Sequence, residues 1–512
     1  MEQWEVRPAS GSDLITNLAS ATDEPADPYL SWETIPWDEA ERHVSGLQAR
    51  ISRAYDNGEV EKVRKLQRQL TRSFDARLLA VKQVTTADGR NTPGVDGELW
   101  RTGDRKLEAA RSLKVEGYRA KPLKRTYVPK KKPGQLRPLG IPTMHDRAMQ
   151  ALYALALDPV EEAHADRSSF GFRRGRCTQD ACARLFSLMA RRTSPTYVLE
   201  GDIAGCFDHI DHQWLLDNVP MDKRVLAQFL RAGFMEAGSW HMTESGTPQG
   251  GPISGVLANY ALDGMEGLLA RRFTLNARGN RDERKAARNR VCLTRYADDF
   301  VVTAATPEVA EEVRGLLEPF LKERGLTLSS EKTLVTHIDD GFDFLGWNFR
   351  KYGGKLLIKP SKDSVKAFLR KTHDVILRDG KAMGPEDLIR VLEPKVRGFA
   401  RHHRHTCCSQ TFARIAYVMN GQLWKWGSRR HPNKTAKWLK RRYWCNAGGN
   451  NNMFGTPDLY LRPITWDHVV RHPQLRGDAN PYLDTEYFAE RRRRASARNA
   501  RALRMPAADV WQ

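Results

Sequence analysis

Several features are scarce or missing in this sequence of 512 residues. Its seven cysteines are odd in number and contain no CxxC pair, so neither a zinc site nor a disulfide framework is indicated. No apolar run is long enough to span a bilayer, and the N-terminus lacks a basic start followed by an apolar segment. No internal repeat is present. These absences predict a protein of the reducing cytoplasm with no membrane partner.

Acidic residues are few relative to basic ones. The chain has 83 Lys and Arg against 62 Asp and Glu, a formal net charge of +21. Such an excess only aids solubility when it is spread evenly, but in stripes it implies a polyanionic partner, usually nucleic acid. The apolar fraction of 40% predicts that most of the chain folds into ordinary globular domains.

Hydrophobic periodicity predicts a mixture of helices and strands. Between residues 35 and 90, apolar residues at three- and four-residue steps predict two amphipathic helices separated by the turn "DNGE". The stretch 125–143 is typical of a β-hairpin with a Lys/Pro/Gly turn. "TYVLEGDIAGCF" predicts a strand, and "GTPQGGPISGVLANYALDGMEGLLA" predicts a Gly-rich turn leading into one long helix. Helices dominate from about 361 to 445.

Two neighbouring acids interrupt an apolar strand at "RYADDF". A buried, unpaired charge is costly, so Asp298 and Asp299 make sense at the tip of a strand–turn–strand that binds divalent cations. Two Mg²⁺ ions can activate an attacking 3′-hydroxyl and stabilise the departing pyrophosphate, which requires a third carboxylate. Asp202 in "YVLEGDIAGCFDHI" offers one, and the Ile203 carbonyl is a further oxygen ligand. The alternative is a pair of plain turn residues; Asp208 is interpreted as capping or structural.

Five sequence blocks together carry a family resemblance. "RPLGIPTMHDRAMQ", "SFGFRRGR", "GDIAGCFDHI", "GTPQGGPISGVLANYAL" and "YADDF" resemble the reverse transcriptases encoded by bacterial group II introns, over about residues 35–490. The resemblance implies an α+β right-hand polymerase, with fingers and palm built on antiparallel sheet, followed by a helical thumb. The expected parts are a flexible tail (1–33), a helical N-terminal extension of the fingers (34–98), fingers and palm (99–357), a thumb or maturase domain X (358–446), a DNA-binding region (447–490) and a basic tail (491–512).

The resemblance assigns roles around the acids. Asp202, Ile203, Asp298 and Asp299 are implied as the ligands of two Mg²⁺ ions, for which Mn²⁺ may substitute. Phe207 is implied to crowd the sugar 2′ position and thereby select deoxynucleotides; a core phenylalanine is the alternative reading.

Further residues are implied to bind the incoming nucleotide. They are Gln249 and Gly250 in "TPQGG", Arg137 with one of Lys130, Lys131 and Lys132 (Lys132 being our choice), and Lys332 as a general acid for pyrophosphate. Gly346 and Trp347 in "FLGWNF" resemble the primer-grip hairpin, although Trp347 is also consistent with a core position.

Nucleic-acid contact is predicted most strongly for residues 425–444, which hold eight Lys or Arg, no acid and interleaved aromatics. The candidate contact residues are Arg429, Arg430, Lys437, Trp438, Arg441 and Arg442. A solvated basic helix is the alternative there and on the helices of 35–90. In "EPKVRGFARHHRH" three histidines, His402, His403 and His405, stand partly where the family motif is richer in tyrosine.

The resemblance also implies partners and limits. The partners are group II intron RNA, a DNA target and primer, and dNTPs, in a ribonucleoprotein at the bacterial nucleoid. After Arg491 there is no Cys or His, so the HNH nuclease of many relatives is expected to be missing and priming to use an existing 3′ end. Alternatives are a stand-alone reverse transcriptase of defence or CRISPR systems and a splicing cofactor only; an RNA-dependent RNA polymerase fits least because of Phe207.

Overall fold

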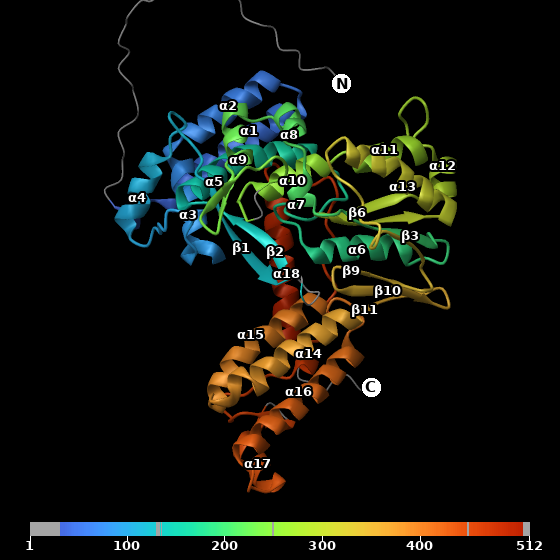
Figure 1. The fold of residues 1–512 in the computed structure, drawn as a ribbon. Helices are drawn as coiled ribbons and strands as arrows, with labels where there is room; N and C mark the ends of the chain where they lie inside the picture. The colour runs from blue at the N-terminus through green and yellow to red at the C-terminus, as the bar shows by residue number, and fades with distance from the viewer. Residues whose placement is uncertain (1–30, 130–133, 135, 248–249, 448–449, 505–512) are drawn as a thin grey trace, which may run out of the picture.

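The computed structural model describes residues 31–504, apart from 130–133, 135, 248–249 and 448–449. A large upper body of helices and sheets carries the fingers and palm, and a helical thumb extends below it (Figure 1). In the described part of the chain no helix combines the length and apolarity that crossing a membrane requires. The expected tail at 1–33 falls almost wholly outside the described residues.

Three helices, where two were predicted, open the described chain. They are α1 (Trp37–Asp56), α2 (Val60–Arg72) and α3 (Phe74–Thr86). The backbone of Ser73 is extended, with ψ of 132°, and ends α2 before α3 begins. The break lets the apolar faces of all three helices pack on α5 (Met144–His164), which is buried over most of its length. Hydrophobic periodicity alone did not predict the break at Ser73, because apolar residues continue at helical spacing before and after it.

The fingers sheet has the strand order β2-β1-β4-β5. Its hairpin, β1 (Leu123–Pro129) and β2 (Leu136–Ile141), is antiparallel and lies where the sequence predicted it. A second hairpin, β4 (Phe234–Glu236) and β5 (Ser239–His241), joins β1 through a short parallel pairing. The upper body also contains the helices α4 (Gly103–Ser112), α8 (His212–Asn218) and α9 (Lys223–Leu230).

The palm sheet is antiparallel throughout, in the order β6-β7-β3-β8. Its strands are β3 (Tyr197–Asp202), β6 (Cys292–Tyr296), β7 (Asp299–Ala304) and β8 (Leu334–His337). One face packs against α13 (Pro307–Lys322) and the other against α6 (Thr178–Met189), as Figure 1 shows. The sheet therefore sits between two helical layers, and only its strand ends can reach a substrate.

The long helix predicted after the Gly-rich turn is two helices. They are α10 (Ser254–Leu262) and α11 (Met265–Phe273), and the chain turns at Gly264, whose φ is +99°. Asp263 turns inward there to pair with Arg295 of β6, and both side chains are completely buried. This ion pair across elements is the reason for the break. The short helices α7 (Cys206–His209) and α12 (Glu283–Asn289) complete the palm.

A three-stranded sheet joins the palm to the thumb. It consists of β9 (Phe342–Phe344), β10 (Trp347–Tyr352) and β11 (Lys355–Pro360). The thumb follows with α14 (Lys362–Leu377), α15 (Pro385–His403), α16 (Ser409–Arg430), α17 (Ala436–Tyr443), β12 (Trp444–Ala447) and β13 (Asn450–Phe454). It has a hydrophobic core of its own.

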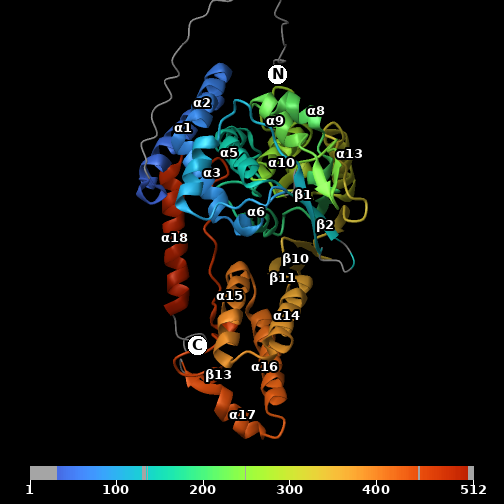
Figure 2. The same ribbon diagram turned by 60° about the vertical axis from the view of Figure 1, so that its left-hand side comes forward.

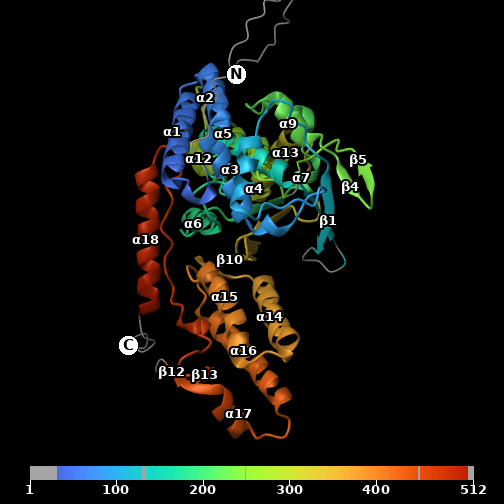
Figure 3. The same cartoon turned by 90° about the vertical axis from the view of Figure 1, so that its left-hand side faces the viewer.

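The C-terminal part returns from the thumb to the upper body. Residues 467–484 run up as an irregular strand-like segment, and α18 (Thr485–Arg504) runs back down beside the thumb (Figures 2 and 3). The boundary expected between 490 and 491 thus lies inside one helix. The last eight residues, 505–512, lie outside the described part.

Candidate functional site

Three carboxylates meet at one end of the palm sheet. Asp202, the last residue of β3, lies directly opposite Asp299, the first residue of β7, and Asp298 precedes it in the turn from β6. Directly opposite residues of an antiparallel pair have Cβ atoms about 4.5–5.5 Å apart. Asp202 and Asp299, 97 positions apart in the sequence, are therefore neighbours in space.

The turn that carries Asp298 is held in an unusual backbone conformation. Ala297 has a φ of +56°, a region that residues with a Cβ rarely adopt. The backbone of Gly171 packs so closely that a Cβ there would lie 2.3 Å from the Ala297 nitrogen. The Arg295 guanidinium donates to the Ala297 carbonyl at 3.4 Å. Packing on both sides thus fixes the tip of the hairpin, which holds the acids in a defined position.

The electrostatics of the acids favour a cation. Burial, and then repulsion from Asp202, raise the pKa of Asp298, which the charges of Arg137 and Lys332 partly offset. Burial, followed by repulsion from Asp298 and Asp202, raises the pKa of Asp299 to about 6. Carboxylate oxygens are hard donors, so this set suits Mg²⁺ or another divalent ion, whose charge would relieve the repulsion.

Lys332 lies at the acids. Its ammonium donates to the Asp202 carboxylate at 2.7 Å, and its backbone N–H donates to the Ser329 carbonyl at 3.2 Å. Ser329 in turn donates its N–H to the Asp202 carbonyl at 2.8 Å. Ile203 follows Asp202 along the chain; its side chain is buried, and it forms an isolated antiparallel bridge with Leu328. The lysine predicted as a general acid is thus a direct neighbour of one metal-ligand candidate.

Phe207 lies on α7, one turn after β3. Its ring is half-buried and meets the Phe172 ring edge-on, with centroids 5.8 Å apart. Its carbonyl accepts the Thr247 N–H at 2.7 Å, which ties α7 to the "TPQGG" turn. A cavity of about 340 Å³ beside the ring is also lined by Gly140 of the fingers and Gly246. The ring packs against the hydrophobic core on one side and borders the cavity between fingers and palm on the other.

The remaining nucleotide-binding candidates lie between fingers and palm as far as the structure describes them. Arg137 is on β2, opposite Val128, and acts electrostatically on Asp298. Gly250 has a φ of +112°, which favours glycine, and a Cβ there would lie 3.7 Å from the Gly140 carbonyl. Lys132 and Gln249 lie outside the described residues.

The primer-grip candidates have different environments. Gly346 is in the turn between β9 and β10 with a φ of +89°, and its carbonyl accepts the Ser361 N–H at 2.9 Å. Trp347 is completely buried, and its ring stacks on His402 at 4.3 Å. The tryptophan packs the hairpin against the thumb, so it can support a primer only through the hairpin backbone.

The basic residues of α16 and α17 separate into two groups. Arg429 and Arg430 donate to the backbone carbonyls of Leu377, Lys381 and Met383, and so join α16 to the end of α14. On α17 the candidate contact residues Lys437, Arg441 and Arg442 are exposed, as is Lys440 between them, while the Trp438 ring packs edge-on against His431.

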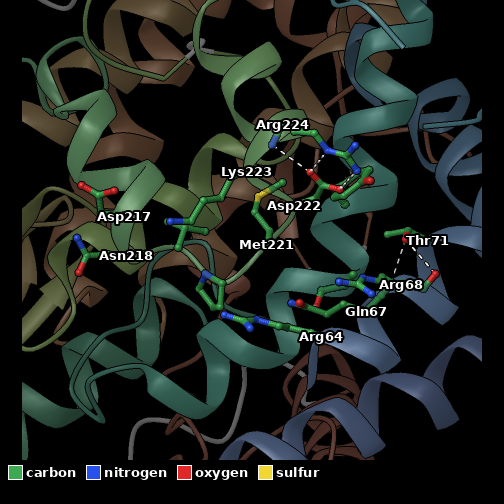
Figure 4. A pocket seen from close by; sticks show the side chains of 14 residues that line it. Arg64, Gln67, Arg68, Thr71, Asp217, Asn218, Met221, Asp222, Lys223 and Arg224 are labelled. Carbon is green, nitrogen blue, oxygen red and sulfur yellow. Dashed lines mark hydrogen bonds and ion pairs between the residues drawn. The ribbon is translucent and has the colours of Figure 1, made fainter. Parts of the chain in front are cut away.

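Two other features lie apart from the acids. A cavity of about 620 Å³ between α2, α5 and the loop from α8 to α9 includes Arg68 and Lys223 among its lining residues, as Figure 4 shows. Cys177, Asp180 and His472 place one sulfur, one oxygen and one nitrogen within 4.8 Å of one another. The Arg491 guanidinium already bonds the carboxylate and lies 3.0 Å from the imidazole, so a cation fills that position.

Sequence reasoning assigned no role to Arg295, although it begins the "RYADDF" motif. Its side chain bonds Asp263, the Asn259 amide oxygen and the turn at Ala297. The only signal in the sequence was an arginine within an apolar strand, where an unpaired charge is costly.

Comparison with known proteins defines the class first. Residues 128–349 match the family model described as "Reverse transcriptase (RNA-dependent DNA polymerase)", and residues 32–113 match its N-terminal domain. Residues 365–444 match the "Group II intron, maturase-specific domain". The fold is accordingly that of a right-hand reverse transcriptase with a maturase thumb.

Individual relatives narrow the class. Protein YkfC of Escherichia coli is 33% identical over 302 residues, 52% of this chain and 78% of that protein. Group II intron-encoded protein LtrA of Lactococcus lactis is 25% identical over 76% of this chain and 78% of its own. A telomerase from Candida albicans aligns with a TM-score of 0.35 and 11% identity over 63% of this chain and 64% of its own. The chain belongs to the family of group II intron reverse transcriptases and maturases.

Proposed function

We propose that the protein is an RNA-directed DNA polymerase in which Asp202, Asp298 and Asp299 bind two Mg²⁺ ions. The observation that carries the proposal is the direct pairing of Asp202 with Asp299, with Asp298 in the adjoining turn. Three mutually repelling carboxylates at the open end of a sheet are unfavourable unless a cation neutralises them. When bound, the ions supply the charge that activates a primer 3′-hydroxyl and stabilises pyrophosphate.

The other side chains then bind and orient the substrates. Arg137 approaches from the fingers and would bind the triphosphate, for which a guanidinium fork is well suited. Phe207 would exclude a 2′-hydroxyl, since its ring is held by Phe172 and borders the open space. Lys332 would hand a proton to pyrophosphate once cations displace it from Asp202.

A primer-extension assay tests this function. Purified protein with Mg²⁺ should extend oligo(dT) on poly(rA), and Asp299→Asn should lower the rate by about 10²-fold or more, as the loss of one charge-stabilising group typically does. Asp340→Asn, which removes an exposed acid in the turn before β9, is the matched control and should keep the wild-type rate. Synthesis by Asp299→Asn at the wild-type rate would overturn the assignment.

We further propose that the protein binds its group II intron RNA, assists splicing and supports intron mobility by target-primed reverse transcription. Support comes from the maturase-specific domain and from the exposed cations of α17. These partners imply a ribonucleoprotein at the nucleoid of a bacterial cytoplasm. Sequencing the RNA recovered with the protein from cells tests this: one intron should dominate. A mixture without any intron would favour a stand-alone reverse transcriptase.

The variant Asp299→Asn also distinguishes the proposed function from the alternative that the protein is a splicing cofactor only. If splicing is the sole activity, wild-type protein will splice but will not extend the primer. If both activities exist, Asp299→Asn loses extension and keeps splicing, because the acids lie on the palm and the maturase domain is the thumb.

A further inference from the structure

The thumb meets the upper body at a joint formed by the sheet β9–β11 and the helices α14 and α15. Its hydrophobic core shares no buried residue with the cores of the fingers and palm among the described residues. At the joint, the Ser361 N–H donates to the Gly346 carbonyl at 2.9 Å and the Cys407 N–H donates to the Ile358 carbonyl at 2.8 Å. The Trp347 ring also packs there against His402, His403 and His405, and any further connection between the two bodies adds to what fixes the angle of the thumb.

The helix α18 is fixed to the palm near its beginning. Arg491 donates to the Asp180 carboxylate, to the Gly175 carbonyl at 3.1 Å and to the Pro473 carbonyl at 3.2 Å. The Asp180 side chain is completely buried and also caps the start of α6, which packs beneath the palm sheet. The Phe488 ring packs over Gly175, where a Cβ would lie 2.7 Å from it.

The segment that leads into α18 is anchored to the fingers as well. The Asn480 amide donates to the Ser52 hydroxyl of α1 at 2.9 Å, and the Tyr482 hydroxyl donates to the Asp158 carboxylate of α5. Tyr482 is 6% exposed. The upper end of the helix is therefore held by α1, α5 and α6 together.

The lower part of the same helix contacts the base of the thumb. The Asn499 amide oxygen accepts a hydrogen bond from Arg404, the residue after α15, and Arg498 donates at 2.9 Å to the carbonyl of Arg471, in the segment that returns from the thumb. Arg404 also pairs with the buried Asp467 at 3.6 Å. The contacts at Arg491 and Asn499 are about 12 Å apart along the helix, and Figures 2 and 3 show α18 spanning the level between the two bodies.

One face of α18 makes all of these contacts. Phe488, Arg491 and Arg498 are three and seven residues apart, which places them on one side of a helix. Arg493 lies on the opposite side and pairs with Glu490 on the helix itself. The same helix is thus hydrogen-bonded to the upper body near its beginning and to the base of the thumb near its end.

We propose that α18 is a brace that fixes the thumb relative to the palm, with Arg491, Arg498 and Asn499 as its positioning residues. This inference rests on the proposed polymerase function, since the thumb angle sets how firmly the template–primer duplex is held between steps. The brace leaves the acids and the nucleotide site untouched. Loosening it should therefore shorten each synthesis run without slowing the addition of a single nucleotide.

The test uses the double variant Arg498→Ala/Asn499→Ala in the full-length protein, on poly(rA)/oligo(dT) with a competitor that traps released enzyme. We expect DNA products per binding event to be about three- to tenfold shorter, the range that loss of one coupling contact produces. The kcat/KM for the first nucleotide should stay within about twofold of wild type. Asn499→Asp should keep wild-type lengths, because its carboxylate still accepts from Arg404.

The control is Arg493→Ala, which removes the same single charge from the opposite side of α18. Its products should keep the wild-type length. Equal shortening in this control would show that the helix acts by touching nucleic acid and would overturn the brace, as would unchanged lengths in the double variant.

Failure of the brace is distinguishable from failure of the polymerase proposal. If the wild-type protein makes no DNA, the polymerase proposal fails. Hydrogen exchange then tests separately whether α18 fixes the thumb relative to the palm. The Ser361 and Cys407 amides at the joint should exchange faster in the double variant than in wild type and Arg493→Ala. Equal exchange in all three proteins would contradict it.

Discussion

At the residue scale, Phe207 borders the open space between fingers and palm, where we propose that it excludes a 2′-hydroxyl. Its ring meets the Phe172 ring edge-on, and its carbonyl accepts a hydrogen bond from Thr247, so both ring and backbone have a defined position. We expect Phe207→Ala to lower the preference for dNTP over rNTP by roughly 10- to 200-fold, the effect typical of a steric change of this size. Competing single-nucleotide additions measure the ratio, and an unchanged preference would refute the role.

Asp299 offers a second prediction, which concerns stability. Its folded pKa of about 6 lies above the ordinary value of 3.8, because burial and the charges of Asp298 and Asp202 disfavour the ionised form. A raised carboxyl pKa means that ionisation at neutral pH destabilises the fold. Without divalent cations, Asp299→Asn should therefore melt at a higher temperature than wild type, and added Mg²⁺ should stabilise wild type more than the variant. Because the Asp299 side chain is partly exposed to solvent, the increase in melting temperature of Asp299→Asn should be modest.

The acids were predictable from sequence because their chemistry requires residue types that a strand otherwise avoids. Asp202, Asp298 and Asp299 stand out in apolar surroundings, and the structure brings them together. The role of Trp347 was ambiguous, because the sequence does not distinguish a tryptophan buried in the core from one that supports a substrate. The ion pair of Lys332 with Asp202 joins positions 130 residues apart. The sequence around either residue does not indicate this pairing.

At the element scale, the joint between β10 and α15 depends on neutral histidines. Burial, and then the neighbouring His402 and His405, lower the pKa of His403 to about 3, and burial followed by His472 lowers that of His405 to about 3. These rings pack on Trp347 together with His402, and Arg404 also faces His405. Neither ring can take up a proton without loss of packing.

The sign of the resulting pH dependence follows. A histidine with a depressed folded pKa contributes its full stability above the unfolded pKa of about 6.5 and loses it as the pH falls toward 3. Each such ring costs up to about 1.4 kcal/mol per pH unit in that window. We expect His405→Phe to reduce this slope. Thermal melting between about pH 5 and 8 measures it, with exposed His373, replaced by Phe, as the control whose slope should equal wild type.

Helix boundaries were less predictable than helices. The break between α10 and α11 comes from Asp263 turning to Arg295, a partner 32 residues away, and the break at Ser73 comes from packing on α5. Both are long-range interactions, which local periodicity does not contain. The fingers hairpin was predicted correctly because its turn residues and alternation are local.

At the scale of the whole molecule, the C-terminal part is where the structure differs most from what the sequence composition suggests. Residues 471–504 are basic and irregular in composition, yet Ala479, Tyr482 and Phe488 are buried against the upper body. Charge composition cannot distinguish an arginine that docks, such as Arg491, from one that faces solvent, such as Arg493, because the difference lies in what each helix face meets. In the thumb, too, charge composition does not distinguish arginines that bond the protein from cations that face solvent, and there the distinction can be tested.

The net charge of +21 predicts that RNA binding weakens steeply with salt, since each phosphate contact releases about 0.7–0.9 counterion. If α17 contacts RNA, the triple variant Lys437→Ala/Arg441→Ala/Arg442→Ala should reduce the slope of log affinity against log salt by about 2–3. Filter binding between about 50 and 200 mM salt measures it. Arg429→Ala/Arg430→Ala is the matched comparison: these arginines bond carbonyls at the end of α14, so the variant should lower the melting temperature and leave the slope nearly unchanged. A slope that falls equally in both variants would mean that exposure on α17 does not mark the contact surface, and that the basic charge of the thumb acts as a whole.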